Sequence, residues 1–201
     1  CALPPVIIMS GLAGIYHLDG KPANPALLQR MIHRIAHRGP DASDYWIKGS
    51  VGIGHVMLHT TSESLDERQP WTDETGTLCL AYDGRIDNRK DLALSLNAAG
   101  FHLRNDTDAE LMLRAYQHWG ESCPEQLIGD FALVIWDGPR QQLFCARDIL
   151  GLKPLYYCHQ RATFCWASEL PPLFEHHATP RSPNEAMIAE FLSGTVVTNT
   201  E

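Results

Sequence analysis

The sequence contains no run of basic residues, no internal repeat and no apolar stretch of the roughly 20 residues needed to cross a bilayer. Its 24 acidic and 16 basic side chains give a formal net charge of −8, which excludes general binding to the nucleic-acid backbone. Segment 2–8 is interrupted by two prolines and lacks a basic flank, so it does not resemble a secretion signal. We therefore expect a cytoplasmic protein that contacts neither membranes nor nucleic acid.

The six cysteines form no C-x-x-C pair and show no spacing typical of zinc ligands. Cys79, Cys145 and Cys165 lie within apolar strand patterns, where a reduced thiol packs as a small hydrophobic group. His33 and His37 are four residues apart in a predicted helix, but no carboxylate or cysteine accompanies them. We expect solvated histidines here and no metal site.

Hydrophobic periodicity predicts a mixture of strands and helices. Strands are predicted at 11–18, 44–48, 51–58, 78–82, near 85–86, and at 131–137, 143–147, 155–159 and 163–167. Helices are predicted from Pro25 to Gly39 and at 87–99, 107–120 and 185–192, with a capping box at Thr107 and Glu110. Because many strands follow one another without an intervening helix, they must pair antiparallel through hairpins. The predicted fold class is therefore α+β with layered sheets.

The run MSGLAGI at residues 9–15 places a small hydroxyl residue between a methionine and an apolar strand pattern. Removal of Met9 would leave Ser10 with a free α-amino group. That is the arrangement of N-terminal-nucleophile hydrolases, in which the first side chain attacks and its own amine is the base. The alternative is a glycine-containing edge strand without chemistry. We expect residues 1–9 to be an N-terminal extension or start-site remnant and the native chain to begin at Ser10; Cys1 lies outside this pattern.

Several further motifs occur in a fixed order: HRGPD at 37–41, GH at 54–55, QP at 69–70, GDFA at 129–132, WD at 136–137, ARD at 146–148, GLKPLYY at 151–157 and ASEL at 167–170. Together they resemble the glutaminase domain of class II glutamine amidotransferases, in the asparagine-synthetase branch. The resemblance implies an amidotransferase domain over 10–201 with a four-layer αββα fold and two stacked antiparallel sheets. It also implies that 198–201 lead into a C-terminal synthetase domain that uses ATP and magnesium, whereas the present domain needs no cofactor.

In active members of this family the first residue is a cysteine that attacks the side-chain amide of glutamine. An asparagine amide and a backbone N–H hold the oxyanion, an arginine binds the substrate carboxylate, and an aspartate binds its ammonium. The resemblance assigns the nucleophile position to Ser10, the oxyanion position to Asp83 and Gly84, and the carboxylate-binding position to Met57. The other substrate-binding positions are Leu58, Thr60, Thr61, Arg85 and Asp108.

Asp108 and Gly84 keep the family residue type, and three of the four departures weaken a glutaminase site, since serine also serves as nucleophile in other N-terminal-nucleophile families. The thioether of Met57 cannot form a bidentate, charge-assisted pair, which is worth roughly 1.5–3 kcal/mol. An ionised Asp83 would repel the charge that the site must stabilise, and loss of one oxyanion donor costs about 10²–10³ in rate. We therefore expect no glutamine hydrolysis. We also expect Arg85, which replaces a glutamate, to turn toward Asp83 or Asp108 and fill the glutamine site.

Runs 57–64 and 83–89 look most similar to the lasso-peptide cyclases, whose glutaminase domain is vestigial. This similarity implies that the synthetase domain adenylates a peptide carboxylate, with a precursor peptide as partner. A homodimer is a separate expectation. Two alternatives stay open. The domain could be an active glutaminase that uses Ser10 in a glutamine-dependent asparagine synthetase, or a non-catalytic module that docks a synthetase domain or binds a peptide.

Overall fold

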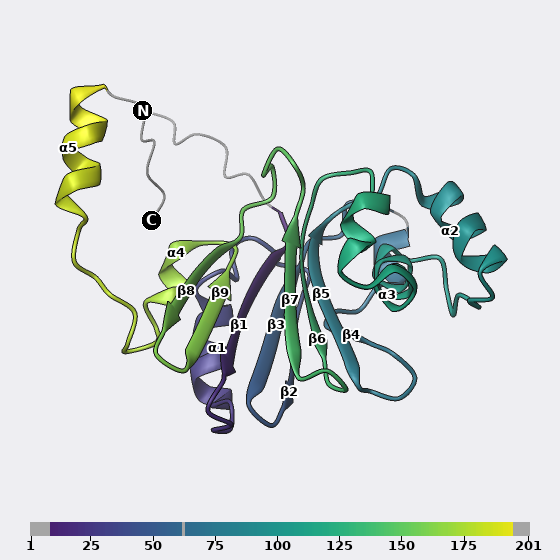
Figure 1. Cartoon of the computed structure of the whole chain (residues 1–201), viewed down its shortest axis with the longest axis horizontal. Coiled ribbons are helices and arrows are strands. Elements are labelled where there is room, and N and C mark those ends of the chain that lie inside the picture. Colours follow the sequence, from purple (N-terminus) through teal and green to yellow (C-terminus); the bar gives the residue numbers. More distant parts are fainter. Residues whose placement is uncertain (1–8, 62, 195–201) are drawn as a thin grey trace.

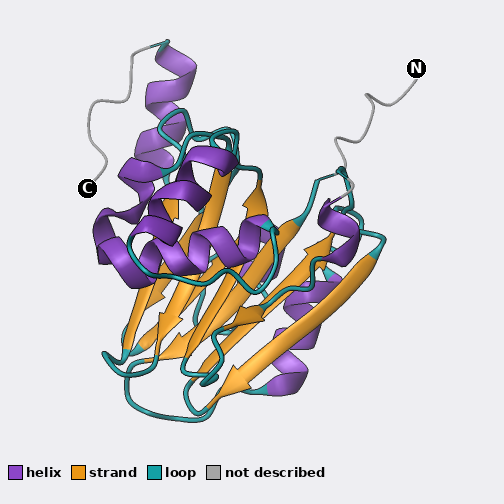
Figure 2. Cartoon of the chain, turned by 90° about the vertical axis from the view of Figure 1, so that its right-hand side faces the viewer, coloured by secondary structure: helices purple, strands orange, loops and turns teal. Residues whose placement is uncertain are grey.

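The computed structural model describes residues 9–61 and 63–194, which form two antiparallel sheets between two groups of helices (Figure 1, Figure 2). The five-stranded sheet has the order β2 (Ala42–Lys48), β3 (Val51–Met57), β1 (Gly11–His17), β9 (Thr163–Ala167) and β8 (Tyr156–Gln160). The four-stranded sheet has the order β4 (Trp71–Thr72), β5 (Leu78–Gly84), β6 (Phe131–Asp137) and β7 (Gln142–Arg147). The helices are α1 (Pro25–His33), α2 (Arg89–Ala98), α3 (Asp108–Trp119), α4 (Leu170–Leu173) and α5 (Glu185–Ser193), with short 3₁₀ segments at Glu63–Asp66 and Gly120–Gln126.

Side-chain alternation along the strands produces the layers. On β1, Leu12 packs in the cluster between the two sheets, whereas Ala13 and Ile15 pack in the cluster formed with α1. On β5, Cys79 lies between the sheets, whereas Leu80 packs in the cluster formed with α2 and α3. The order of layers is therefore helix, sheet, sheet, helix, and the predicted αββα architecture is confirmed. No helix in the described part of the chain is long and apolar enough to cross a membrane.

Helix α1 begins as predicted but ends early. The Asn24 side chain accepts hydrogen bonds from the backbone of the first turn, and Pro25 occupies the first helical position. The apolar pattern continues to the fully buried Ile35, yet the helix ends at His33 and residues 34–38 form turns. The tighter hydrogen bonds Ile35 N–H to Ile32 and Arg38 N–H to Ile35 replace the helical pattern there. The predicted extension to Gly39 was wrong because burial of Ile35 imitates a helical face.

Two other local predictions need correction. The strand predicted near 85–86 does not form, since β5 ends at Gly84. The chain passes close to Asp130 here, because a Cβ at Gly84 would lie 2.1 Å from the Asp130 carbonyl oxygen. The capping box is half formed: Thr107 Oγ1 accepts from the Glu110 N–H at 3.3 Å, but the Glu110 carboxylate is bound elsewhere. The remaining predicted elements agree with the structure to within two residues at each end.

Candidate functional site

A cavity lies where the start of β1 meets the ends of β3 and β5 and the first turn of α3. All nine positions singled out in the sequence line it: Ser10, Met57, Leu58, Thr60, Thr61, Asp83, Gly84, Arg85 and Asp108. Antiparallel pairing explains part of this convergence, since β1 and β3 run in opposite directions and Gly11 lies opposite Val56. The structure brings the positions together, while the catalytic and binding roles given to them stay predictions.

The Ser10 hydroxyl is fixed by its neighbours on β3 and in the loop that follows. Its Oγ accepts a hydrogen bond from the Leu58 N–H at 3.0 Å and lies 3.7 Å from the Met57 Sδ, toward which it can donate. The Ser10 carbonyl oxygen accepts from Arg38 Nε at 3.0 Å. Ser10 is therefore held at the cavity by contacts to both its backbone and its side chain.

Asp83 is almost completely buried and lies between two cations. Its Oδ2 accepts from Arg38 Nη2 at 3.2 Å, and its Oδ1 lies 3.4 Å from Lys153 Nζ. Burial raises the pKa of the Asp83 carboxyl above its ordinary value, and the charges of Lys153 and Arg38 oppose this effect. Arg38 also binds Glu169 at 3.2 Å, and Lys153 Nζ lies 3.4 Å from the Met9 Sδ. The two cations thus join the start of β1 in one sheet to the end of β5 in the other.

Asp108 lies at the first position of α3. Its Oδ2 accepts from the Ile86 N–H at 3.0 Å, and its Oδ1 forms an ion pair with Arg89 Nη1 at 3.1 Å. Arg89 also donates to the Asp106 carbonyl oxygen. The carboxylate that was predicted to bind an ammonium group therefore already has a cation beside it.

A third buried carboxyl group, that of Glu67, lines the cavity and was missed in the sequence. Glu67 accepts hydrogen bonds from Tyr82 Oη at 2.8 Å, from Gln69 Nε2 at 2.7 Å and from the Ala109 N–H at 3.3 Å. Burial raises the pKa of Glu67, and these hydrogen bonds oppose the rise. Gln69 belongs to a recognised motif, but nothing in the sequence around Glu67 indicates that loop residues 67–69 fold back onto β5.

The prediction that Arg85 fills the site was wrong. Its Nε pairs with Asp87 at 3.2 Å, and 65% of the Arg85 side chain is exposed. Asp83 and Asp108 do not need it, because Arg38, Lys153 and Arg89 already supply their positive charges. An arginine that is not required inside remains hydrated at the rim. Arg38 and Lys153 were present in the HRGPD and GLKPLYY motifs, which was the available signal.

No group of three or more metal-ligating side chains in the described residues has a geometry that could hold a metal ion. His37 Nε2 contacts Glu169 at 3.0 Å, and His33 is exposed on α1.

The chain matches the family model described as "Glutamine amidotransferase domain" over residues 9–201. It is 33% identical over 196 residues to "Asparagine synthetase [glutamine-hydrolyzing] 2" of Bacillus subtilis (strain 168), covering 95% of this chain and 26% of that protein. It is also 37% identical over 145 residues to "Amidase chry2" of Gibberella zeae, covering 71% of this chain and 22% of that protein. The chain thus spans about a quarter of the length of the curated relatives that it matches.

Among solved structures, the glutamine phosphoribosylpyrophosphate amidotransferase of B. subtilis superposes with a TM-score of 0.68 at 21% identity, covering 84% of this chain and 44% of that chain. A likeness at this identity concerns the fold. It agrees with the two stacked antiparallel sheets and their flanking helices.

Proposed function

Because this chain belongs to the glutamine amidotransferase domain family, we propose that it is the glutaminase-type domain of an asparagine-synthetase-like amide ligase and that it does not hydrolyse glutamine at an enzymatic rate. The observation on which this proposal rests is the ion-paired state of Asp83. Hydrolysis of an amide passes through an oxyanion, which must meet hydrogen-bond donors already in place. A carboxylate held between Arg38 and Lys153 accepts hydrogen bonds and offers none.

The substrate carboxylate also lacks a free cation. Met57 presents a buried thioether at the position that the family gives to arginine. Three cations line the cavity in the described part of the chain, and each has an acidic partner: Arg85 with Asp87, Arg89 with Asp108, and Lys153 with Asp83. Binding of free glutamine would have to break one of these pairs, which supports a pocket no longer suited to that substrate.

One specific observation favours a second candidate, an active glutaminase that uses Ser10. The Ser10 hydroxyl lines the cavity, and so does the Lys153 ammonium, which could hold an oxyanion in place of the missing amide. The name of the Bacillus relative, "Asparagine synthetase [glutamine-hydrolyzing] 2", is consistent with this alternative. In that case Lys153→Met would abolish turnover.

The rest of the proposed protein is a synthetase domain in the same polypeptide, as the greater length of the relatives suggests. ATP and magnesium would act in that domain on a carboxylate substrate. The names of the relatives support the asparagine-synthetase branch. Three points stay predictions: the assignment to the lasso-peptide cyclases, a precursor peptide as partner, and a homodimer.

Covalent labelling tests the proposal. The chain is produced behind a removable leader, so that cleavage exposes the Ser10 amine, and intact mass verifies the new terminus. It is then incubated with an electrophilic ketone analogue of glutamine. We expect no adduct, and the same result for Ser10→Ala. An adduct that forms with the chain beginning at Ser10 and is absent from Ser10→Ala would favour the active glutaminase instead.

A further inference from the structure

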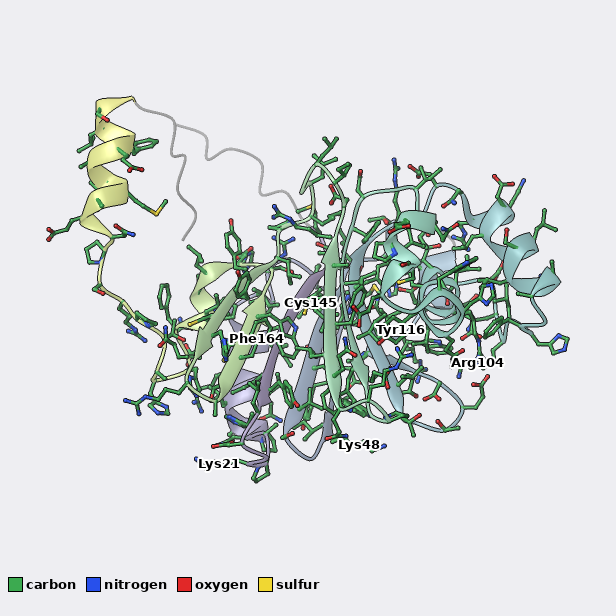
Figure 3. The ribbon with its side chains drawn as sticks, in the orientation of Figure 1. Lys21, Lys48, Arg104, Tyr116, Cys145 and Phe164 are labelled. Carbon is green, nitrogen blue, oxygen red and sulfur yellow. The ribbon has the colours of Figure 1, made fainter. Side chains whose placement is uncertain are left out.

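A second cavity, of about 660 Å³, lies at the opposite end of β1 from Ser10. Seven strand residues separate the two ends, which corresponds to about 23 Å at roughly 3.3 Å per residue. The lining comes from four segments: the end of β1, the turn after it, the β8–β9 hairpin and the segment that follows α4. In Figure 3, Lys21 marks this end of the molecule. Neither the family assignment nor the proposed function involves this region.

The lining is rich in groups that are, or can become, positive. His17, Lys21, Arg161, His176 and His177 all contribute to it. The His17 and His176 ring centroids are 6.3 Å apart, and those of His176 and His177 are 4.6 Å apart. Among the described residues that line it, Asp19 is the only acidic one, and it pairs with Lys21 at 2.8 Å in an exposed position.

The His176 side chain gives the second observation. Only 7% of His176 is exposed, and its ring lines the cavity with its centroid 6.3 Å from that of His17 and 4.6 Å from that of His177. Imidazole rings this close together can direct several N–H donors at one ligand in the cavity. His17 uses Nδ1 for Thr163 Oγ1 at 3.1 Å, which leaves Nε2 as the ring nitrogen that a ligand in the cavity would contact.

We propose that this cavity binds an oxyanion of the phosphate or sulfate type, held by N–H donors of His17 and His176 with Lys21 and Arg161 at its rim. An anion matches the excess of cationic groups, and charge-assisted hydrogen bonds to such oxygens are strong. A metal ion fits less well, because no group of three suitable ligands with metal-binding geometry occurs in the described residues. Nearby Glu175 does not oppose an anion, since its carboxylate is bound by Arg30 and Arg34.

Binding at this site should depend on pH. The pKa of His17 is lowered, chiefly by burial. The charge of Asp19 opposes this effect, and the charge of Lys21 adds to it. Burial also lowers the pKa of His176, and His177 and His17 act in the same direction. Both rings are therefore largely neutral above pH 7, and an anion that binds the imidazolium forms must bind more tightly as the pH falls.

The test is calorimetric titration of the full chain with sulfate, whose charge does not change between pH 6 and pH 8, at constant ionic strength set with chloride. We expect affinity at pH 6 to be at least about tenfold higher than at pH 8. His176→Gln should weaken binding at pH 6 about tenfold, whereas His102→Gln, which changes an exposed histidine between α2 and α3, should leave it unchanged.

A second measurement covers the case in which His176→Gln fails to fold. Proton NMR of the imidazole rings should show that sulfate raises the pKa of His17 and His176 in the unmodified chain. Equal affinity at both pH values, an equal response to chloride, or an equal loss in His102→Gln would overturn the proposal. Binding of zinc through His176 without any binding of sulfate would also overturn it and would assign the cavity to a metal.

Discussion

Replacement of Glu110 by glutamine should remove the charge that anchors the first turn of α3, and with it the backbone that holds Asp108. The Glu110 side chain is fully buried and accepts from Trp71 Nε1 at 2.9 Å, from Arg104 Nε at 2.9 Å and from Arg114 Nε at 2.7 Å. Arg104, labelled in Figure 3, also stacks over the Trp71 ring at 4.4 Å. Glutamine keeps the volume of the side chain but loses the charge that both guanidinium groups contact.

The size of the effect follows from the pKa of Glu110. Burial raises it, but the hydrogen bonds from Arg104, Trp71 and Arg114 outweigh burial and lower the pKa from 4.5 to about 2. At 1.36 kcal/mol per pKa unit, this difference corresponds to about 3 kcal/mol of folding stability. Because the folded pKa is lowered, this contribution is fully present above pH 4.5 and is lost as the pH falls toward 2. For a chain of this length, we expect Glu110→Gln to lower Tm by roughly 6–12 °C at pH 7.

Urea unfolding at pH 7 and pH 3 measures the effect, with Glu125→Gln, a change at an exposed glutamate, as the matched control. We expect Glu110→Gln to lose about 3 kcal/mol at pH 7 and less at pH 3, with no comparable change in the control. A loss of under about 1 kcal/mol at pH 7, as for an exposed ion pair, would refute the reasoning.

Three further predictions concern the core and the site. Arg38→Met should lower the unfolding free energy by about 3 kcal/mol, because it removes one of two cations from buried Asp83; a loss below about 1 kcal/mol would contradict this. Asp83→Asn should gain stability relative to the unmodified chain as the pH rises from 4 to 7, because burial raises the folded pKa of Asp83 and so disfavours its ionised form. Urea unfolding of both proteins measures this, and a difference in unfolding free energy that stays constant from pH 4 to pH 7 would argue against it. Gly14→Ala should cost about 1–3 kcal/mol or more, since its Cβ would lie 2.0 Å from the Trp166 ring; unchanged thermal unfolding followed by tryptophan fluorescence would show that the sheets can adjust.

The fold could be predicted because it depends on short-range patterns. Alternation on segments such as 78–82 and 131–137 fixes which side chains face each sheet, and consecutive strands without helices can pair only through hairpins. The end of α1 could not be predicted, since the burial of Ile35 continues the helical pattern through a turn.

The sequence predicted which residues would gather at the candidate site, but not which charged groups pair there. The resemblance carried by the ordered motifs located Ser10, Asp83 and Asp108, and the structure brings them to one cavity. The cations that neutralise Asp83 come from residues 45 positions before it and 70 positions after it, at Arg38 and Lys153. Such pairs depend on how the two sheets stack, and no local spacing encodes that arrangement. The inference that Arg85 must be the counter-ion failed for this reason.

The most direct test of whether the site with the ion-paired Asp83 has lost glutaminase activity is the steady-state release of glutamate from glutamine. The chain that begins at Ser10 is compared with its Ser10→Ala variant. We predict that both proteins release glutamate at the rate of buffer alone. Turnover on the order of 1 s⁻¹, the low end for ordinary enzymes, that disappears in Ser10→Ala would contradict the account.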